Sequence, residues 1–263
     1  CINDTYEPGS TFKLVTGTAA LEENVVSVED TFSCPGFRVV EDRKIRCHKV
    51  GGHGTETFKE GFMNSCNPVF MDVGARVGVS DMYKTYRKLG LFDKTGVDLP
   101  GEASSIMHKQ ENVKSVELAT MSFGQSFQIT PMQLLRSASA VINGGTLVTP
   151  HFGMYTTDEE GELKQEFEYP IKENVIDKKT SEKDTLNFLK STLKYCRSKK
   201  IKHLYLNHNE YKNEFHKLCK RYKINCSTST CVLTDKVIDN IKNGAYFVFN
   251  QYYDVEYINR LTR

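Results

Sequence analysis

Apolar residues recur every three to four positions along much of the first two thirds of the chain, which is typical of helices with one buried face. The expected helices cover residues 11–23, 57–63, 67–78, 81–92 and 131–143. Pro131 stands near the start of the last helix, and Gly90 ends the helix before it. Residues 37–46 alternate in the manner of a strand or hairpin. The pattern predicts an α+β fold with many helices and few strands.

The balance of charge changes sharply near Lys183. Residues 184–263 hold 15 Lys and Arg against 7 Asp and Glu, a net charge of +8, which leaves 20 against 26 and a net of −6 for residues 1–183. All 7 prolines and 17 of the 18 glycines also precede this point. Two compositions predict two parts, a domain over residues 1–183 and a basic tail over residues 184–263. Because the chain opens on Cys1, we expect it to be a piece of a longer protein.

The first candidate for chemistry is the sequence Ser-Thr-Phe-Lys at residues 10–13. Residues three apart share a face of a helix, so Lys13 can approach the Ser10 hydroxyl and accept its proton. The apolar neighbours Phe12, Leu14 and Val15 would desolvate the amine and lower its pKa toward neutrality. The motif alone is weak, because residues 191–194 match it as well and a serine at a helix start is commonly a cap.

The surrounding sequence makes the assignment specific. YEPGSTFK at residues 6–13 is followed in order by GGHGT at 51–55, NSCNP at 64–68, FGQ at 123–125 and TPMQL at 130–134. These segments resemble those of the class B penicillin-binding proteins, closest to the division and sporulation transpeptidases. The resemblance runs from about residue 2 to about residue 180. It implies the mainly helical part of a penicillin-binding or serine β-lactamase-like transpeptidase domain, with a small α+β tail.

The resemblance also implies an activity, peptidoglycan crosslinking by serine D,D-transpeptidation. Ser10 would attack the penultimate D-alanine carbonyl of a stem peptide, and Lys13 would be its general base. Ser65 would relay a proton to the leaving amine, and Asn67 would orient the substrate amide. β-Lactams would acylate Ser10. No metal or organic cofactor is implied, and cell-wall synthesis or division proteins are possible partners.

The family also places the parent enzyme. It would face the outside of the bacterial cytoplasmic membrane, held by an N-terminal anchor outside this sequence. No apolar run in the sequence given reaches the roughly 18 residues needed to span a bilayer.

The family's third motif, Lys-Thr/Ser-Gly on a strand beside the nucleophile, has no match after Pro150. Residues 94–96 read Lys-Thr-Gly, but they lie in a segment that resembles a family loop, so we interpret them as a decoy. Most of the family's central sheet should be absent with the third motif. Losing one oxyanion donor costs roughly 3–4 kcal/mol of transition-state stabilisation, so we expect impaired catalysis. The alternatives are a non-catalytic remnant that binds peptidoglycan or partners, and a nucleic-acid-binding tail on an inactive passenger.

The 8 cysteines form no C-x-x-C pair, which leaves a zinc ribbon or thioredoxin motif unsupported. Cys34 and Cys47 flank the predicted hairpin and would either pair in an oxidising compartment or stay free. Cys66 lies between Ser65 and Asn67, where it either packs as a small buried residue or faces the cleft and sensitises catalysis to oxidation.

In the tail we expect three helices, with strands near residues 203–207 and 245–253. Its net charge of +8 favours a solvated lysine face over nucleic-acid contact. Four tail residues could together bind a zinc ion, although their spacing matches no common site: His216, Cys219, Cys226 and Cys231.

Overall fold

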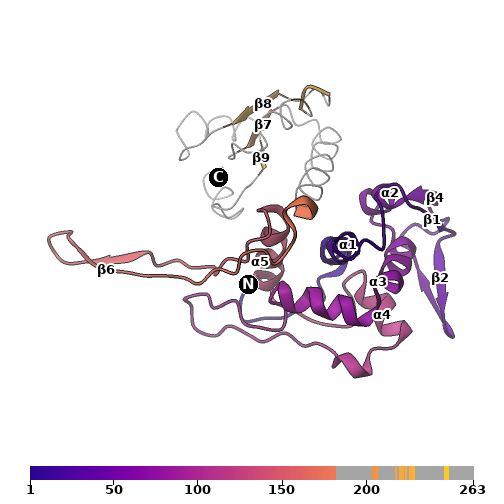
Figure 1. Cartoon of the computed structure of the whole chain (residues 1–263), viewed down its shortest axis with the longest axis horizontal. Coiled ribbons are helices and arrows are strands. Elements are labelled where there is room, and N and C mark those ends of the chain that lie inside the picture. The colour runs from indigo at the N-terminus through magenta and orange to yellow at the C-terminus, as the bar shows by residue number, and fades with distance from the viewer. Residues whose placement is uncertain are drawn as a thin grey trace. The chain divides into compact units, whose positions relative to one another are not determined.

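The computed structural model describes residues 1–181 and, beyond them, residues 203–206, 217, 219–221, 223, 225–228 and 246–248. The chain divides into two compact units, Cys1–Asp184 and Thr185–Arg263 (Figure 1). No helix in the described part of either unit is long and apolar enough to cross a membrane.

The described residues of the second unit include a three-stranded parallel sheet in the order β8-β7-β9. Its strands are β7 (His203–Leu206), β8 (Asn225–Thr228) and β9 (Tyr246–Val248). β7 and β9 fall within the two predicted strands, whereas β8 was not expected. The predicted tail helices fall largely outside the described residues, as do His216 and Cys231 of the considered zinc set.

Helices form most of the first unit, as the apolar spacing predicts. They are η1 (Gly9–Phe12), α1 (Lys13–Glu22), α2 (Phe58–Met63), α3 (Asn67–Lys88), η2 (Gln110–Asn112), α4 (Ser115–Met121) and α5 (Pro131–Ile142). α1 packs against α3 and α5, and α4 covers another side of α3 (Figure 1). Phe12 anchors this core, because its buried ring meets the rings of Tyr86 and Phe127 at centroid distances of 5.4 and 4.6 Å. Phe12, which directly precedes Lys13, is thus fixed by aromatic packing.

Two helix starts follow from local hydrogen bonds. The Thr57 hydroxyl accepts from the Glu60 backbone N–H at 3.2 Å, while the Glu60 carboxylate accepts from the Thr57 N–H at 2.8 Å. Thr130 and Gln133 form the same reciprocal arrangement ahead of α5. Each pair satisfies donors that a helix start leaves without intrahelical partners, so the helices begin where the sequence predicted.

α3 contains the two helices expected over residues 67–78 and 81–92. They meet at a kink at Gly78, where φ is +76° and ψ is 166°, and the second helix ends at Lys88. That backbone conformation is accessible to glycine and strained for other residues. The kink accordingly falls at the last residue of the first predicted helix.

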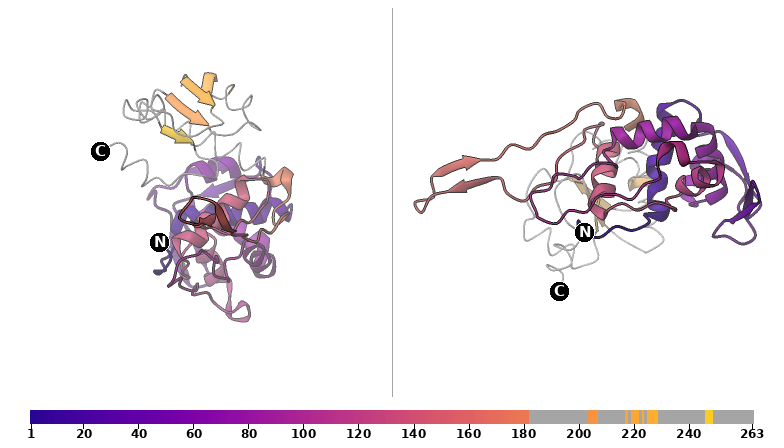
Figure 2. Two further views of the ribbon diagram at one scale, coloured as in Figure 1. Left: turned by 90° about the vertical axis from the view of Figure 1, so that its left-hand side faces the viewer. Right: turned by 90° about the horizontal axis from the view of Figure 1, so that it is seen from below.

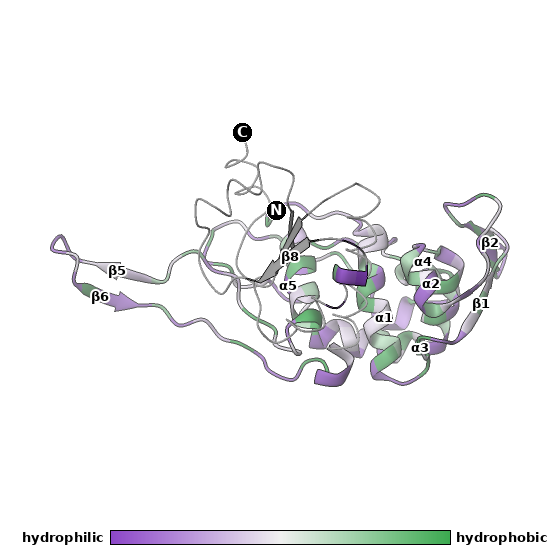
Figure 3. Cartoon of the chain, turned by 90° about the horizontal axis from the view of Figure 1, so that it is seen from above, coloured by the Kyte–Doolittle hydropathy of each residue, from purple (hydrophilic) through white to green (hydrophobic). Residues whose placement is uncertain are grey.

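The strands of the first unit form separate antiparallel pairs. β1 (Thr31–Cys34) pairs with β4 (Gly54–Thr57), β2 (Phe37–Val40) with β3 (Arg43–Arg46), and β5 (Tyr155–Thr157) with β6 (Leu163–Glu166). No larger sheet occurs within residues 1–181, as expected for a domain that lacks its central sheet. The β5–β6 hairpin extends away from the helices, at the end of the unit opposite β1 and β2 (Figure 2). Hydrophilic residues dominate β6, whereas apolar residues line the packed helices (Figure 3).

Two carboxylates hold these strands to the helical body. The Arg38 guanidinium donates to both carboxylate oxygens of Asp72, which fixes the β2–β3 hairpin to α3. At the other end, the Asp98 carboxylate accepts from the backbone N–H groups of Phe152 and Gly153 and from the Tyr169 hydroxyl. The second set gathers both arms of the extended β5–β6 hairpin at their base.

Candidate active site

Ser10 lies in the short helix η1, one turn before α1, and its position depends on a strand-like contact with residues 123–129. Tyr6 and Ile129 exchange backbone hydrogen bonds of 3.0 and 3.1 Å, and the Gly9 N–H donates to the Gly124 carbonyl at 2.8 Å. Gly124 has φ +84°, and a Cβ there would lie 2.1 Å from the Gly9 carbonyl oxygen. Residues 123–125, which the sequence singled out, therefore lie directly behind the serine turn.

Lys13 is the first residue of α1 and brings the four predicted site residues together. Its Nζ lies 3.2 Å from Ser10 Oγ, 3.0 Å from Ser65 Oγ, 2.6 Å from the Ser65 carbonyl oxygen and 2.8 Å from Asn67 Oδ1. The side chain is 2% exposed. One buried amine is thus shared by two hydroxyls and two oxygens that only accept hydrogen bonds.

Burial lowers the pKa of Lys13 from its ordinary value of 10.5 to about 8. The nearby thiol groups of Cys66 and Cys47 act weakly in the opposite direction. The Phe70 ring, whose centroid is 5.5 Å from Nζ, closes one side of the amine. The expected mechanism of desolvating the lysine is therefore present, although Phe70 was not among the apolar residues that the sequence suggested for it.

Ser65 and Asn67 reach Lys13 from the turn that joins α2 to α3. Ser65 has φ +52°, a left-handed conformation that is uncommon for a residue other than glycine. The Cys66 N–H donates to the Gly61 carbonyl at 2.8 Å, which closes the turn. The Asn67 amide donates to the Arg46 carbonyl at 3.2 Å while its Oδ1 faces Lys13, so this hydrogen bond orients the amide.

The Lys-Thr-Gly sequence at residues 94–96 belongs to a loop. The backbone N–H groups of Thr95 and Gly96 and the Thr95 hydroxyl all donate to the carboxylate of Glu102. A third motif of the family would instead lie on a strand and present these groups to the substrate. The contacts with Glu102 support the interpretation of this sequence as a decoy.

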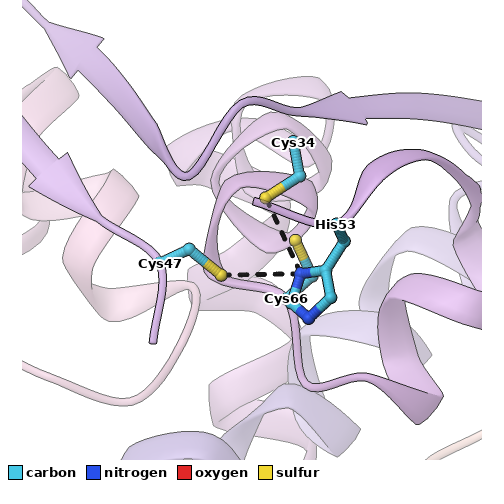
Figure 4. A group of neighbouring side chains, drawn as sticks. All are labelled: Cys34, Cys47, His53 and Cys66. Atoms are coloured by element: carbon cyan, nitrogen blue, oxygen red, sulfur yellow. Dashed lines mark hydrogen bonds between the residues drawn. The ribbon is translucent and has the colours of Figure 1, made fainter. Parts of the chain in front are cut away.

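A group of cysteines beside the site was not predicted from the sequence. Cys34, Cys47 and Cys66 are buried free thiols, and together with His53 they place four potential ligand atoms within 4.8 Å of one another. Figure 4 shows their side chains converging. Burial, with a contribution from Glu56, raises the pKa of the Cys66 thiol. The missed signal was His53 within GGHGT, six residues after Cys47.

Comparison with known proteins identifies the class to which this fold and site belong. The model of the penicillin binding protein transpeptidase domain matches residues 1–196, so the chain belongs to this family, as its sequence motifs predicted. The match continues beyond the boundary that composition placed near Lys183.

Among particular relatives, the chain is 43% identical to stage V sporulation protein D of Bacillus subtilis (strain 168) over 179 residues, which are 67% of this chain and 28% of that protein. It is 30% identical to the peptidoglycan D,D-transpeptidase MrdA of Acinetobacter baumannii, over 57% of this chain and 24% of that protein. The solved structure of penicillin binding protein 3 from Mycobacterium tuberculosis, complexed with aztreonam, matches with a TM-score of 0.66 and 24% identity over 72% of this chain and 42% of that chain, which shows the fold alone. The chain spans under a third of the length of these two curated relatives.

Proposed function

We propose that the first unit carries the serine acyl-transfer site of a peptidoglycan D,D-transpeptidase, with Ser10 as nucleophile and Lys13 as general base. The observation that supports this most directly is the 3.2 Å contact between Lys13 Nζ and Ser10 Oγ in a buried setting. Distances of this size allow a proton to pass from the hydroxyl to the amine as the oxygen attacks.

The contacts of Lys13 indicate how the neutral amine would be oriented. A neutral amine has two N–H donors and one lone pair, whereas the Ser65 carbonyl and Asn67 Oδ1 can only accept. If these two oxygens take the two N–H groups, the lone pair is left for a hydroxyl. Ser10 and Ser65 are the two hydroxyls within reach, so the same amine can take the proton of Ser10 and exchange it with Ser65.

The lowered pKa of Lys13 sets how much of the base is available. With a pKa of about 8, the neutral amine is about 9% of the total at pH 7, against about 0.03% for an ordinary lysine. This several-hundredfold gain in free base makes a lysine competent without a histidine. Ser65 then relays the proton to the leaving amine, and Asn67 orients the substrate amide.

The substrate we propose is the D-alanyl-D-alanine end of a peptidoglycan stem peptide, with β-lactams as acylating analogues. The names of the relatives support this, one being a peptidoglycan D,D-transpeptidase and another a structure complexed with aztreonam. The family assignment also supports a location on the outer face of the bacterial cytoplasmic membrane and contact with cell-wall synthesis or division proteins.

We expect the activity to be impaired, because residues 150–181 include no strand beside Ser10 that carries a Lys-Thr/Ser-Gly motif. The strands in this range, β5 and β6, form the extended hairpin instead. Without the oxyanion donor that such a strand supplies, acylation loses roughly 3–4 kcal/mol of transition-state stabilisation. We also propose that the domain ends near Lys183 and that residues 184–263 are a tail of separate origin.

Intact-mass spectrometry of the full chain after incubation with benzylpenicillin tests the site. Acylation transfers the opened β-lactam to Ser10 Oγ with no leaving group, so the mass rises by that of the whole inhibitor. The Ser10→Ala variant is the control, and Ser191→Ala tests the second Ser-x-x-Lys sequence. An adduct that is lost in Ser10→Ala alone supports the site, and a slow adduct supports the impairment. A folded chain that forms no adduct would instead favour the non-catalytic remnant.

A further inference from the structure

The cysteine cluster occupies the side of the Ser65–Asn67 turn that does not face Lys13. Its four members come from separate segments: Cys34 ends β1, Cys47 follows β3, His53 precedes β4 and Cys66 is the N-cap of α3. His53 Nδ1 lies 3.7 Å from Cys34 Sγ and 3.6 Å from Cys47 Sγ, and all four atoms are within 4.8 Å of one another. Figure 4 shows the three sulfur atoms gathered near one ring nitrogen of the imidazole.

These separations fit the corners of a tetrahedral metal site. Zinc binds thiolate sulfur at about 2.3 Å and imidazole nitrogen at about 2.0–2.1 Å, so neighbouring ligand atoms in a tetrahedron lie about 3.5–3.8 Å apart. The two sulfur–nitrogen distances fall within that range. Three sulfurs and one nitrogen form the Cys₃His set of closed structural zinc sites, and thiolate ligands discriminate against magnesium and calcium.

A second observation concerns the charge around the cluster. Glu56, on β4, is 4% exposed, and its Oε1 accepts no hydrogen bond from the described residues. This oxygen lies 3.7 Å from His53 Nδ1, while the other accepts from the Asn64 amide at 2.9 Å. A buried carboxylate oxygen that accepts no hydrogen bond is costly. A divalent cation among the neighbouring ligand atoms would compensate it.

We propose that Cys34, Cys47, His53 and Cys66 bind one zinc ion, which ties the β1–β4 and β2–β3 pairs to the start of α3. Binding requires the three thiols to release their protons to solvent, with no change of oxidation state. With four protein ligands the ion has no open position for substrate, so its role is structural. Because Cys66 is the middle residue of the Ser65–Asn67 segment, the ion also fixes the turn that places both neighbours against Lys13.

The alternative chemistry of the same residues is oxidation. Two of the three thiols would then form a disulfide, and the third would stay free, because three sulfurs cannot all pair. A disulfide lowers the intact mass by two hydrogens and prevents the paired sulfurs from binding zinc as thiolates. Zinc content and intact mass therefore distinguish the two states of the cluster.

The experiment is metal analysis of the full chain, purified under reducing conditions and without chelators. We expect one zinc ion per chain in the wild type and in Cys1→Ser, which removes an exposed cysteine outside the cluster. Cys34→Ser should lose the zinc, since it removes one ligand without changing the residues that contact Lys13. Cobalt(II) added to the metal-free wild type should give the intense visible absorption of a tetrahedral thiolate site.

A stability measurement keeps the test independent of whether Cys34→Ser folds. Removing zinc from the wild type with a chelator should lower its melting temperature, and equimolar zinc should restore it. The proposal would be overturned by a wild-type chain that contains no zinc and whose melting temperature does not change with either chelator or added zinc. It would also be overturned by an intact mass two hydrogens lower in chain purified without reductant, together with a melting temperature that is the same with and without added zinc. Neither readout depends on acylation of Ser10, so zinc binding and the proposed function can fail separately.

Discussion

Replacing Gly124 by alanine would test how the serine turn is held in place. Gly124 has φ +84°, and an added Cβ would lie 2.1 Å from the Gly9 carbonyl oxygen and 2.7 Å from the Gly9 nitrogen. Both are backbone atoms of the residue before Ser10, so no side-chain rotation can relieve the contact. The substitution must therefore move the turn that carries the nucleophile or break the 2.8 Å hydrogen bond from Gly9 to Gly124.

Gly101 offers a matched control for the backbone strain. Its φ is +85°, but a Cβ there meets nothing within 4 Å. Both alanines bear the left-handed cost, about 1–2 kcal/mol per residue. Gly124→Ala adds about 1–3 kcal/mol for overpacking and about 0.5–1.5 kcal/mol for the hydrogen bond. The reduction of unfolded-chain entropy is common to both variants and cancels from the comparison.

Urea unfolding of the full chain at constant zinc and pH measures this difference. We expect Gly124→Ala to be less stable than Gly101→Ala by about 2–4 kcal/mol. For a unit of this length that difference corresponds to a melting temperature roughly 4–16 °C lower. If wild-type Ser10 is acylated, the Gly124 variant should also be acylated more slowly, because small displacements of a nucleophile are costly. Equal stabilities of the two variants would refute the inference that Gly124 leaves no space behind the turn.

Three further substitutions test other parts of the structure. Between about pH 8 and 10.5, the free energy of unfolding of the wild type should rise with pH relative to that of Lys13→Met. In this range the unfolded chain still binds the Lys13 proton, whereas the folded chain, with a Lys13 pKa of about 8, has released it. Parallel pH profiles of the two proteins would contradict this. Arg38→Ala should lower the free energy of unfolding by about 1–2 kcal/mol, since it removes two hydrogen bonds to Asp72 on α3. The control Arg43→Ala, at an exposed position of the same hairpin, should change the free energy of unfolding by less than about 0.5 kcal/mol. Asp98→Asn should speed proteolysis within residues 150–170, with cleavage rates followed by mass spectrometry. The hydrogen bond from the Gly153 N–H is the largest cause that lowers the pKa of Asp98, so the wild type should show the same faster cleavage as pH falls below the ordinary aspartate pKa and through this lowered pKa. Unchanged cleavage rates would mean that this carboxylate does not hold the base of the hairpin.

The helices were predictable because their signals are local. Thr57 and Thr130 each have Glu or Gln three residues later, which is the sequence of a reciprocal cap, and Pro131 occupies a first-turn position. The break at Gly78 also has a local signal, since this glycine ends an apolar repeat and adopts a backbone conformation that is accessible to glycine. What the spacing could not show is which neighbours these two segments contact, since their packing against α1 and α4 depends on tertiary structure.

The candidate site was predictable through motifs, whereas the cysteine cluster was not. Ser10 and Lys13 are neighbours on one helical turn, and Ser65 and Asn67 were added by resemblance rather than by any spacing rule. Cys34, Cys47, His53 and Cys66 have separations of 13, 6 and 13 residues, which match no common zinc pattern. They meet only because β1 pairs with β4 and the intervening β2–β3 hairpin folds back beside them, a consequence of tertiary structure.

The backbone of Cys66 explains how one three-residue segment can face two sites. Cys66 is extended, with φ −72° and ψ 117°, and in an extended chain successive side chains point to opposite sides. Ser65 and Asn67 both face Lys13, while the side chain between them points away, toward Cys34 and Cys47. The left-handed conformation of Ser65 also turns its carbonyl oxygen to within 2.6 Å of the amine. A metal bound by Cys66 would hold this segment from behind, at a position where it cannot compete with substrate for the amine.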